Sequence, residues 1–429
     1  MVTSHARLEI DPFEHLLASY HDGGRPALEA RVLSSPWGTP SQRTALPYTP
    51  PQVDALIRLL ERPSLGAAEL RSELPALRSL GWVKAGQLTL SRAELLERVG
   101  RQLYETLFPR GPVRTALNVS LSQARHARSP LAFQLHLDKE AGFLARLPWE
   151  LLHDDHGYLL KSGRLALARY IAFRAPATAV SVNGPLRVLV VVARPRDQAV
   201  LDSEAELAAL RRSLGSLTGS RGLEVQVLQP PTWRAFVDAL NSAPYHIVHF
   251  DGHGDFGRRC PACRQLAPPS DAVCLARAPR GGACGERLEA VSPQGYLAFE
   301  RPDGATDWRS AENLAAALFR NREVRLAVLS ACRSATVGAG LVFAGTGPAL
   351  IGMGVPAVVA MQFEVPLGAA VSFSETLYAA LARREPLIEA VAGARARLDD
   401  ESWYRPALYL RGRGDARGVL FDPRGEGEP

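Results

Sequence analysis

Two stretches decide the fold of this 429-residue chain: YHIVHFDGHG at residues 245–254 and VRLAVLSACRS at residues 324–334. Each is a largely apolar run that ends in small and polar residues. A third apolar run, LRVLVVVA, occupies residues 186–193. Runs of this kind predict strands that are buried on both faces. Segments with helical periodicity separate them, so the sequence predicts an α/β domain with a mainly parallel sheet and helices on both faces.

A reactive side chain stands just past the end of each of the first two strands: His253 and Cys332. The carboxyl ends of parallel strands meet in one crevice, so these side chains can come together despite their separation in sequence. A cysteine needs a nearby base or cation to ionise at neutral pH, and a histidine supplies it. The backbone amides of Gly254 and Cys332 are candidate oxyanion donors. Taken singly, Cys332 also fits a small buried hydrophobic residue and His253 a loop residue; together they predict a Cys–His dyad.

The chain divides at a segment rich in Pro, Ala, Ser and Asn around residues 175–185. This composition predicts a linker between one domain at residues 1–180 and a second at residues 185–429. The capping-box pattern at Ser91 and the apolar periodicities around it predict further elements in both domains. These are a hairpin of Leu16–Tyr20 and Ala27–Leu33, helices over Val53–Leu60 and Ser91–Phe108, and a helix that begins at Ser203.

Composition and the ends of the chain narrow the class of protein. The chain is 46% hydrophobic and 22% charged and has no low-complexity tract, which excludes disordered and fibrous classes. Its formal net charge of +6 is too small for this length to demand nucleic acid. The first residues lack a signal-peptide pattern, and the longest apolar stretch, Pro348–Met361, is too short and too interrupted to span a membrane. We therefore expect a cytoplasmic protein with reduced thiols.

Four of the five cysteines lie in one insertion at about residues 257–290, with the spacing C-x2-C-x10-C-x9-C. The first pair can face one ion across a two-residue turn, which predicts a structural zinc site, although the second spacing departs from the usual pair of CxxC motifs. Reduced thiols, a redox pair and disulfides are the alternatives. From Gly257 to Arg287, six arginines against Asp271 and Glu286 also make the insertion basic. The predicted metal ligands are Cys260, Cys263, Cys274 and Cys284; no organic cofactor is expected.

Five further blocks surround these motifs. They are RVLSSPWG at 31–38, LPWELL at 147–152, RVLVVVARPRD at 187–197, GVPAVVAMQ at 354–362 and WYRPALYLR at 403–411. Together with HFDGHG and LSAC, this ordered set resembles the CHAT family of bacterial caspase-like cysteine peptidases, which is related to caspases and separase. The resemblance runs over nearly the whole chain. Ser330 departs from the Asn that many relatives carry, and the sequence lacks the tetratricopeptide repeats that many relatives append.

The resemblance implies a caspase-like fold for the second domain and a degenerate, non-catalytic companion domain before it. It implies a cysteine endopeptidase, a thiol protease, with Cys332 as nucleophile, His253 as general base and the amides of Gly254 and Cys332 as the oxyanion hole. The implied substrate is a protein partner, for example a gasdermin-like pore former that is encoded nearby. The implied setting is antiviral defence or programmed cell death in bacteria. A latent enzyme that a partner or self-cleavage opens is a further alternative.

Caspase-like enzymes line the pocket for the P1 residue with side chains near the ends of two strands. Here these places hold Arg194, Arg196, Asp197, Gln362 and Glu364, of which Arg194, Asp197, Gln362 and Glu364 are the pocket candidates. Both signs of charge are present, so neither a basic nor an acidic P1 residue is favoured. Solvated loop charges are the alternative interpretation of Asp197 and Glu364.

The sequence lacks the motifs of three other classes of catalytic or nucleotide-binding site. A zinc deaminase needs His-x-Glu ahead of Pro-Cys-x-x-Cys, whereas Gly254-Asp255 follows His253. The sequence has neither a GxxxxGK[ST] phosphate loop nor the G-x-S-x-G elbow of serine hydrolases. The competing function is a catalytically silent caspase-like scaffold that binds a protein or nucleic-acid partner through the basic insertion.

Overall fold

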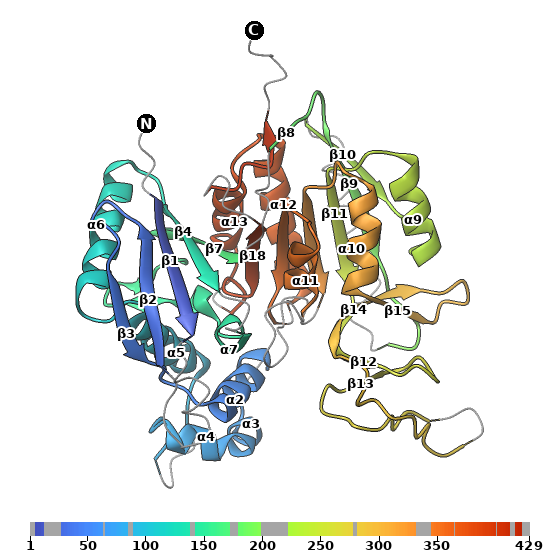
Figure 1. Cartoon of the computed structure of the whole chain (residues 1–429), viewed down its shortest axis with the longest axis horizontal. Coiled ribbons are helices and arrows are strands. Elements are labelled where there is room, and N and C mark those ends of the chain that lie inside the picture. Colours follow the sequence, from blue (N-terminus) through green and yellow to red (C-terminus); the bar gives the residue numbers. More distant parts are fainter. Residues whose placement is uncertain are drawn as a thin grey trace. The chain divides into compact units, whose positions relative to one another are not determined.

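The computed structural model describes residues 5–12, 27–62, 65–84, 89–137, 142–171, 179–198, 222–277, 281–331, 345–363, 365–399, 401–411 and 417–422. The chain forms two compact units, Met1–Tyr170 and Ile171–Pro429, drawn in blue to teal and in green to red in Figure 1. The division falls just before the predicted linker. The strand predicted at Leu16–Tyr20 and the helix predicted from Ser203 lie outside the described residues.

The sheet of the first unit has the strand order β7-β4-β1-β2-β3. β1 pairs antiparallel with β2 and parallel with β4, and β3 pairs antiparallel with β2. The second strand of the predicted hairpin is therefore present as β2, and its partner is the earlier strand β1. The strands are β1 (His5–Pro12), β2 (Ala27–Ser34), β3 (Ser41–Ala45), β4 (Leu131–Leu137) and β7 (Leu165–Ile171).

The two predicted helices of the first unit are present as α2 (Pro50–Glu61) and α5 (Arg92–Leu107). The capping box at the start of α5 forms: the Ser91 hydroxyl accepts from the Glu94 amide at 3.2 Å, and the Glu94 carboxylate accepts from the Ser91 amide at 2.8 Å. The other elements are α3 (Ala67–Ser72), α4 (Leu74–Ser79), α6 (Pro112–His126), α7 (Gly142–Ala145), η1 (Trp149–Leu151), β5 (His153–Asp154) and β6 (Gly157–Tyr158).

The acidic residue of the LPWELL block, Glu150, forms a fully buried ion pair with Arg169. Arg169 and Glu150 are each 1% exposed, and the guanidinium donates to both carboxylate oxygens, at 3.0 and 2.5 Å. Arg169 also donates to the carbonyls of Ala145 and Leu147, at 2.8 and 3.1 Å. These bonds satisfy both buried charges, so the LPWELL block has a structural role in the core of the first unit.

The second unit carries the mainly parallel sheet predicted from the sequence. Its strand order is β10-β9-β11-β16-β17-β18; the first five are parallel to one another and β18 is antiparallel to β17. All described residues of β11 and β17 are buried, as expected for strands covered on both faces. The strands are β9 (Leu186–Val192), β10 (Leu223–Val227), β11 (Ile247–Gly252), β16 (Leu326–Ala331), β17 (Ala357–Met361) and β18 (Pro406–Arg411).

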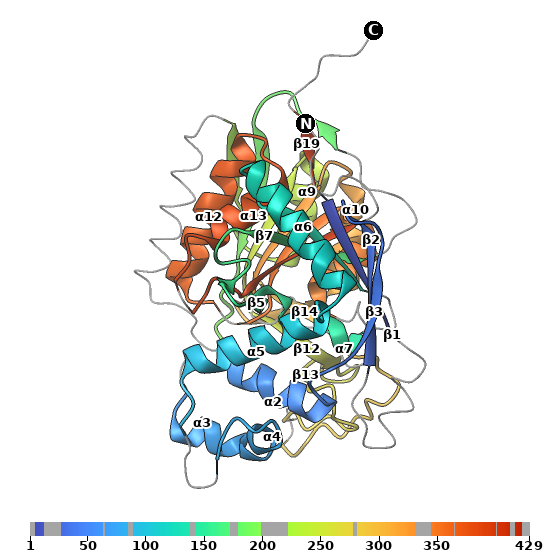
Figure 2. The same cartoon turned by 90° about the vertical axis from the view of Figure 1, so that its left-hand side faces the viewer.

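Helices lie on both sides of these strands. In Figure 2, α12 and α13 lie on one side and α9 and α10 on the other. The α/β class with helices on both faces, predicted from the alternating pattern, is therefore confirmed. The helices are α9 (Trp233–Ser242), α10 (Ala311–Arg320), α11 (Thr346–Gly352), α12 (Leu367–Ala382) and α13 (Leu387–Arg395).

A second, antiparallel sheet follows β11. Its order is β13-β12-β14-β15, with β12 (Gly254–Arg259), β13 (Leu266–Ala267), β14 (Gln294–Glu300) and β15 (Thr306–Ser310). The short strands β8 (Val180–Ser181) and β19 (Phe421–Asp422) pair separately. In the described part of the chain, no helix combines the length and the hydropathy that crossing a membrane requires.

Candidate functional site

The carboxyl ends of β11 and β16 lie next to each other in the sheet of the second unit. Their parallel register runs from Ile247 opposite Leu326 to Gly252 opposite Ala331. Gly252 and Ala331 directly precede His253 and Cys332 in the sequence. Cys332 itself lies outside the described residues. The register therefore brings the two strand ends that lead into the predicted dyad to one edge of the sheet.

His253 is held through its backbone between β11 and the antiparallel sheet. Its carbonyl accepts a hydrogen bond from the Ala298 amide at 3.0 Å, and the next residue, Gly254, begins β12. At Gly252 an added Cβ would lie 2.9 Å from the carbonyl oxygen of Ala193, so this strand end requires glycine. The half-buried side chain of His253 thus extends from a tightly packed backbone.

An ion pair braces the strand end two residues before His253. Arg194 donates to the Asp251 carboxylate, to the Asp251 carbonyl at 2.9 Å and to the Ala193 carbonyl at 3.1 Å. Its backbone amide donates to Glu300 at 2.8 Å. Asp251 is only 5% exposed, and burial raises the pKa of its carboxyl although Arg194 opposes the shift. Asp251 is not among the residues predicted from the sequence; an acidic residue ending an apolar strand is the signal that points to it.

Asp197 and Gln362, two of the other predicted pocket residues, also make internal hydrogen bonds. Asp197 accepts from the amide and the hydroxyl of Thr306, at 2.9 and 2.6 Å. Gln362 is buried and donates to the carbonyl of Tyr404 at 3.2 Å. Glu364 lies outside the described residues. The internal hydrogen bonds therefore fix the loops at the strand ends through Arg194, Asp197 and Gln362.

The two histidines inside β11 or beside it belong to the core. His249 is 1% exposed, and its Nδ1 lies 2.7 Å from the hydroxyl of Tyr378. Burial lowers the pKa of His249 to about 4. The Nδ1 atom of His246 accepts from the Arg187 amide at 2.8 Å. Both side chains therefore connect elements of the second unit.

The four cysteines of the insertion come together. All four Sγ atoms lie within 4.8 Å of one another; Cys260 and Cys284 are 3.8 Å apart and Cys263 and Cys274 3.6 Å apart. These separations exclude disulfides in this arrangement, since bonded sulfurs lie about 2.05 Å apart. A tetrahedral ion with metal–sulfur bonds of about 2.3 Å separates its ligands by about 3.8 Å. The cluster thus has the chemistry and the spacing to hold one metal ion.

Backbone pairing explains how the long second spacing is accommodated. The Cys274 amide donates to the Glu286 carbonyl at 2.8 Å, and the Cys284 amide donates to the Ala276 carbonyl at 2.7 Å. The two cysteines therefore lie on facing arms of a hairpin. Burial opposes ionisation of Cys260, but the amides of Cys263 and Ala262 outweigh it and lower the pKa of Cys260 to about 7. Burial raises the pKa of Cys274 to about 12.

The fold and the paired strand ends define an α/β protein with a candidate Cys–His site at the carboxyl edge of a parallel sheet. The CHAT domain model matches residues 97–408. The chain therefore belongs to the CHAT domain family. No curated protein matches the sequence.

Two groups of solved structures are similar to this chain. Separase in the Saccharomyces cerevisiae separase–securin complex shares 11% identity over 95% of this chain, with a TM-score of 0.45, and the match spans only 30% of the separase chain. The Arg-specific cysteine proteinase gingipain R shares 8% identity over 77% of this chain and 68% of its own, with a TM-score of 0.36. At these identities and TM-scores, neither likeness assigns an activity to this chain.

Proposed function

We propose that this chain is a caspase-like cysteine endopeptidase whose catalytic dyad is Cys332 and His253. The observation that carries the proposal is the parallel register of β11 and β16, which sets Gly252 opposite Ala331 immediately before the two residues. Catalytic side chains in open α/β sheets gather at this carboxyl edge. Membership of the CHAT domain family, which the sequence motifs also indicated, supports the same assignment.

The proposed chemistry is acyl transfer through a thioester. His253 takes the proton of Cys332, and the thiolate attacks the carbonyl carbon of the scissile peptide. The amides of Gly254 and Cys332 stabilise the negative charge on the carbonyl oxygen. The C–N bond breaks as His253 returns its proton to the leaving amine. Water then attacks the thioester with His253 as base, which releases the acid and restores the thiol.

The substrate in this proposal is a protein, and the resemblance that suggests it also suggests its setting. We infer bacterial antiviral defence or programmed cell death in the cytoplasm, a substrate such as a gasdermin-like pore former, and activation by a partner. Arg194 and Asp197 form internal bonds. They would therefore shape the P1 pocket, together with Gln362 and Glu364, by fixing its loops.

The ion proposed for the cysteine cluster is zinc. Cys260, Cys263, Cys274 and Cys284 would supply four thiolates, the donor set of structural zinc sites. The ion would stabilise the insertion and take no part in peptide cleavage. The small core there consists of Cys260, Cys274, Ala267 and Leu288, so few apolar contacts are available to order these residues otherwise.

Labelling of Cys332 tests the dyad without knowledge of the substrate. Purified protein is treated with iodoacetamide near neutral pH, and alkylation of Cys332 is timed by mass spectrometry. We expect His253→Ala to slow alkylation of Cys332 by roughly tenfold or more, because the thiolate fraction falls. The matched control is Ser330→Ala, which alters a neighbour of Cys332 outside the dyad and leaves the rate unchanged.

Cleavage completes the test. A peptide library or the proteins encoded by neighbouring genes serve as substrates, and Cys332→Ala is expected to abolish all cleavage. If His253→Ala leaves alkylation unchanged and Cys332→Ala cleaves normally, the dyad is wrong. If the wild-type Cys332 reacts only like an ordinary thiol and no partner induces cleavage, the silent scaffold that binds through the basic insertion is favoured instead.

A further inference from the structure

A cavity of 730 Å³ lies within the first unit, whereas the proposed dyad belongs to the second. Residues of α6, the segment after α6, the β5–β6 hairpin and the loop before β7 line it. Its volume falls in the range of about 300–1,000 Å³ that is typical of small-molecule sites. Eight of the eleven residues that line it have polar side chains; three of these are arginines, Arg125, Arg128 and Arg164, and a single one is a carboxylate, Asp154.

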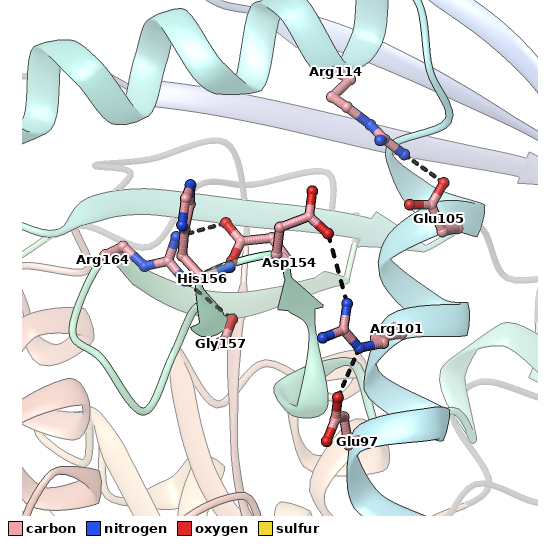
Figure 3. Close-up of polar contacts among 9 residues, drawn as sticks. Glu97, Arg101, Glu105, Arg114, Asp154, His156, Gly157 and Arg164 are labelled. Atoms are coloured by element: carbon pink, nitrogen blue, oxygen red, sulfur yellow. Dashed lines mark hydrogen bonds and ion pairs between the residues drawn. The ribbon is translucent and has the colours of Figure 1, made fainter.

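The one carboxylate of the lining is already neutralised. Arg164 donates to both oxygens of Asp154, at 2.5 and 2.8 Å, and to the Gly157 carbonyl at 3.0 Å (Figure 3). The backbone amide of His156 donates to the same carboxylate at 2.8 Å. Burial raises the pKa of Asp154, but these hydrogen bonds outweigh it and hold the pKa below its ordinary value. Asp154 therefore compensates Arg164 and leaves Arg125 and Arg128 uncompensated.

The acidic side chains near this hairpin are also paired. Arg101 contacts two carboxylates: that of Glu97 at 2.8 Å, drawn in Figure 3, and that of Asp155 at 3.6 Å. Glu105 contacts Arg114 at 2.6 Å. In the described part of the chain, no side-chain hydrogen bond or ion pair engages Arg125 or Arg128. These two guanidiniums thus face the cavity region without a protein anion to balance them.

The backbone at Arg128 adds an independent observation. Arg128 follows the end of α6 with φ of 53°, in the left-handed region. α4 ends with the same pair of backbone bonds, and there Gly81 occupies the equivalent position with φ of 71°. A side chain at such a position costs about 1 kcal/mol relative to glycine. The chain therefore carries an arginine at the cavity edge where the backbone favours glycine.

A second helix ends with an arginine in the same left-handed conformation as Arg128, and there the guanidinium has a hydrogen-bond acceptor within the protein. Arg384 follows the last turn of α12 with φ of 60° and the same backbone bonds. Its guanidinium donates to the Gly184 carbonyl at 2.6 Å. Arg128 has the strained backbone without such an acceptor among the described residues. This contrast points to an acceptor that comes from outside the chain.

We propose that this cavity binds a phosphorylated small molecule of about nucleotide size, with its phosphate held by Arg125 and Arg128. Guanidinium groups bind phosphate through paired, charge-assisted hydrogen bonds. The Asn118 amide and the Ser122 hydroxyl line the same cavity and offer further donors. The carboxyl end of α6 carries a partial negative charge, so the arginines and not the helix supply the attraction. A concave site of this volume suits a compact ligand better than an extended nucleic-acid strand.

Calorimetric titration of the full chain with ATP and with inorganic pyrophosphate at 150 mM salt, roughly physiological ionic strength, tests the proposal and needs no enzymatic activity. We expect both probes to bind, and Arg125→Gln and Arg128→Gly each to weaken binding by roughly tenfold or more. Arg128→Gly should fold at least as stably as the parent, because glycine suits its backbone. Loss of binding in that variant therefore reports the side chain and not misfolding.

The matched control is Arg78→Gln in α4, which removes the same charge three residues before the equivalent Gly81. It should bind both probes like the parent. Absence of binding for both probes up to millimolar concentration would overturn the proposal, as would equal binding by Arg128→Gly. Tighter binding of a single-stranded RNA, weakened equally by Arg78→Gln and Arg125→Gln, would overturn it as well, because it would indicate a non-specific basic surface.

Discussion

The end of β11 and the cysteine insertion that follows it are neighbours in the chain, but different forces stabilise them. β11 lies between β9 and β16, and all of its residues are buried. The insertion has a core of two buried cysteines with Ala267 and Leu288. Hydrophobic burial and a backbone ladder position the first region, whereas the second depends on its thiols. We therefore expect Cys332 to be dispensable for folding, whereas Cys260 and Cys274 are part of the core of the insertion.

Arg194→Met should have the largest effect on global stability. It leaves the buried Asp251 carboxylate at the end of β11 without its cation, which costs about 3–5 kcal/mol. Urea unfolding monitored by circular dichroism measures the loss. The matched control is Arg196→Met, whose side chain is 69% exposed and should change stability by about 0.5 kcal/mol or less. Equal losses of unfolding free energy in the two variants would contradict a stabilising role for the Arg194–Asp251 ion pair.

Cys274→Ser should disrupt the insertion and leave β11 intact. We expect bound zinc to fall from an equimolar amount to near zero, because one of four ligands is lost. Hydrogen exchange should then accelerate across residues 257–290 while β11 stays protected. Cys332→Ser, which changes the one cysteine outside the cluster, should retain the metal. A wild-type protein that is free of metal and still protected throughout the insertion would contradict the zinc site.

The core of β11 should also make stability dependent on pH. The folded pKa of His249 is about 4, against about 6.5 in an unfolded chain. Between these values the unfolded chain binds a proton that the folded chain does not. Stability should therefore fall by up to about 3 kcal/mol as pH decreases from about 6.5 to about 4.

His249→Gln removes this titration and should flatten the dependence of unfolding free energy on pH over that interval. The control is His126→Gln, which changes an exposed histidine on α6 and should keep the slope of the parent protein. An unchanged slope in His249→Gln would show that another group is responsible.

The smallest effect on stability is expected for Cys332→Ala. The described ladder between β11 and β16, from Ile247 opposite Leu326 to Gly252 opposite Ala331, is backbone pairing, which a change of one small side chain further along the sequence leaves in place. Its unfolding free energy should match that of the parent within about 0.5 kcal/mol, even though cleavage is lost. A destabilisation of several kcal/mol would assign Cys332 to the core. Both regions would then depend on a cysteine for folding, contrary to the comparison made above.

Local patterns in the sequence predicted much of this architecture. The apolar runs that begin at residues 186, 245 and 324 contain the adjacent parallel strands β9, β11 and β16, and the capping box at Ser91 begins a helix. Such features depend on residues close in sequence, which is why periodicity and capping motifs reveal them. The pairing of β12 to β15 into an antiparallel sheet could not be predicted, because β12, GDFGRR, has a single apolar residue and lacks the alternation that indicates a strand.

Sequence alone determined that His253 and Cys332 follow strands and that four cysteines share one insertion. Only the tertiary structure decided that Gly252 stands opposite Ala331 and that Cys274 and Cys284 face each other across a hairpin. It also decided that Arg194 contacts Asp251 and that Arg128 has no such partner among the described residues. The physical reason is range: side-chain periodicity is set by near neighbours, whereas register and charge pairing join residues far apart in sequence.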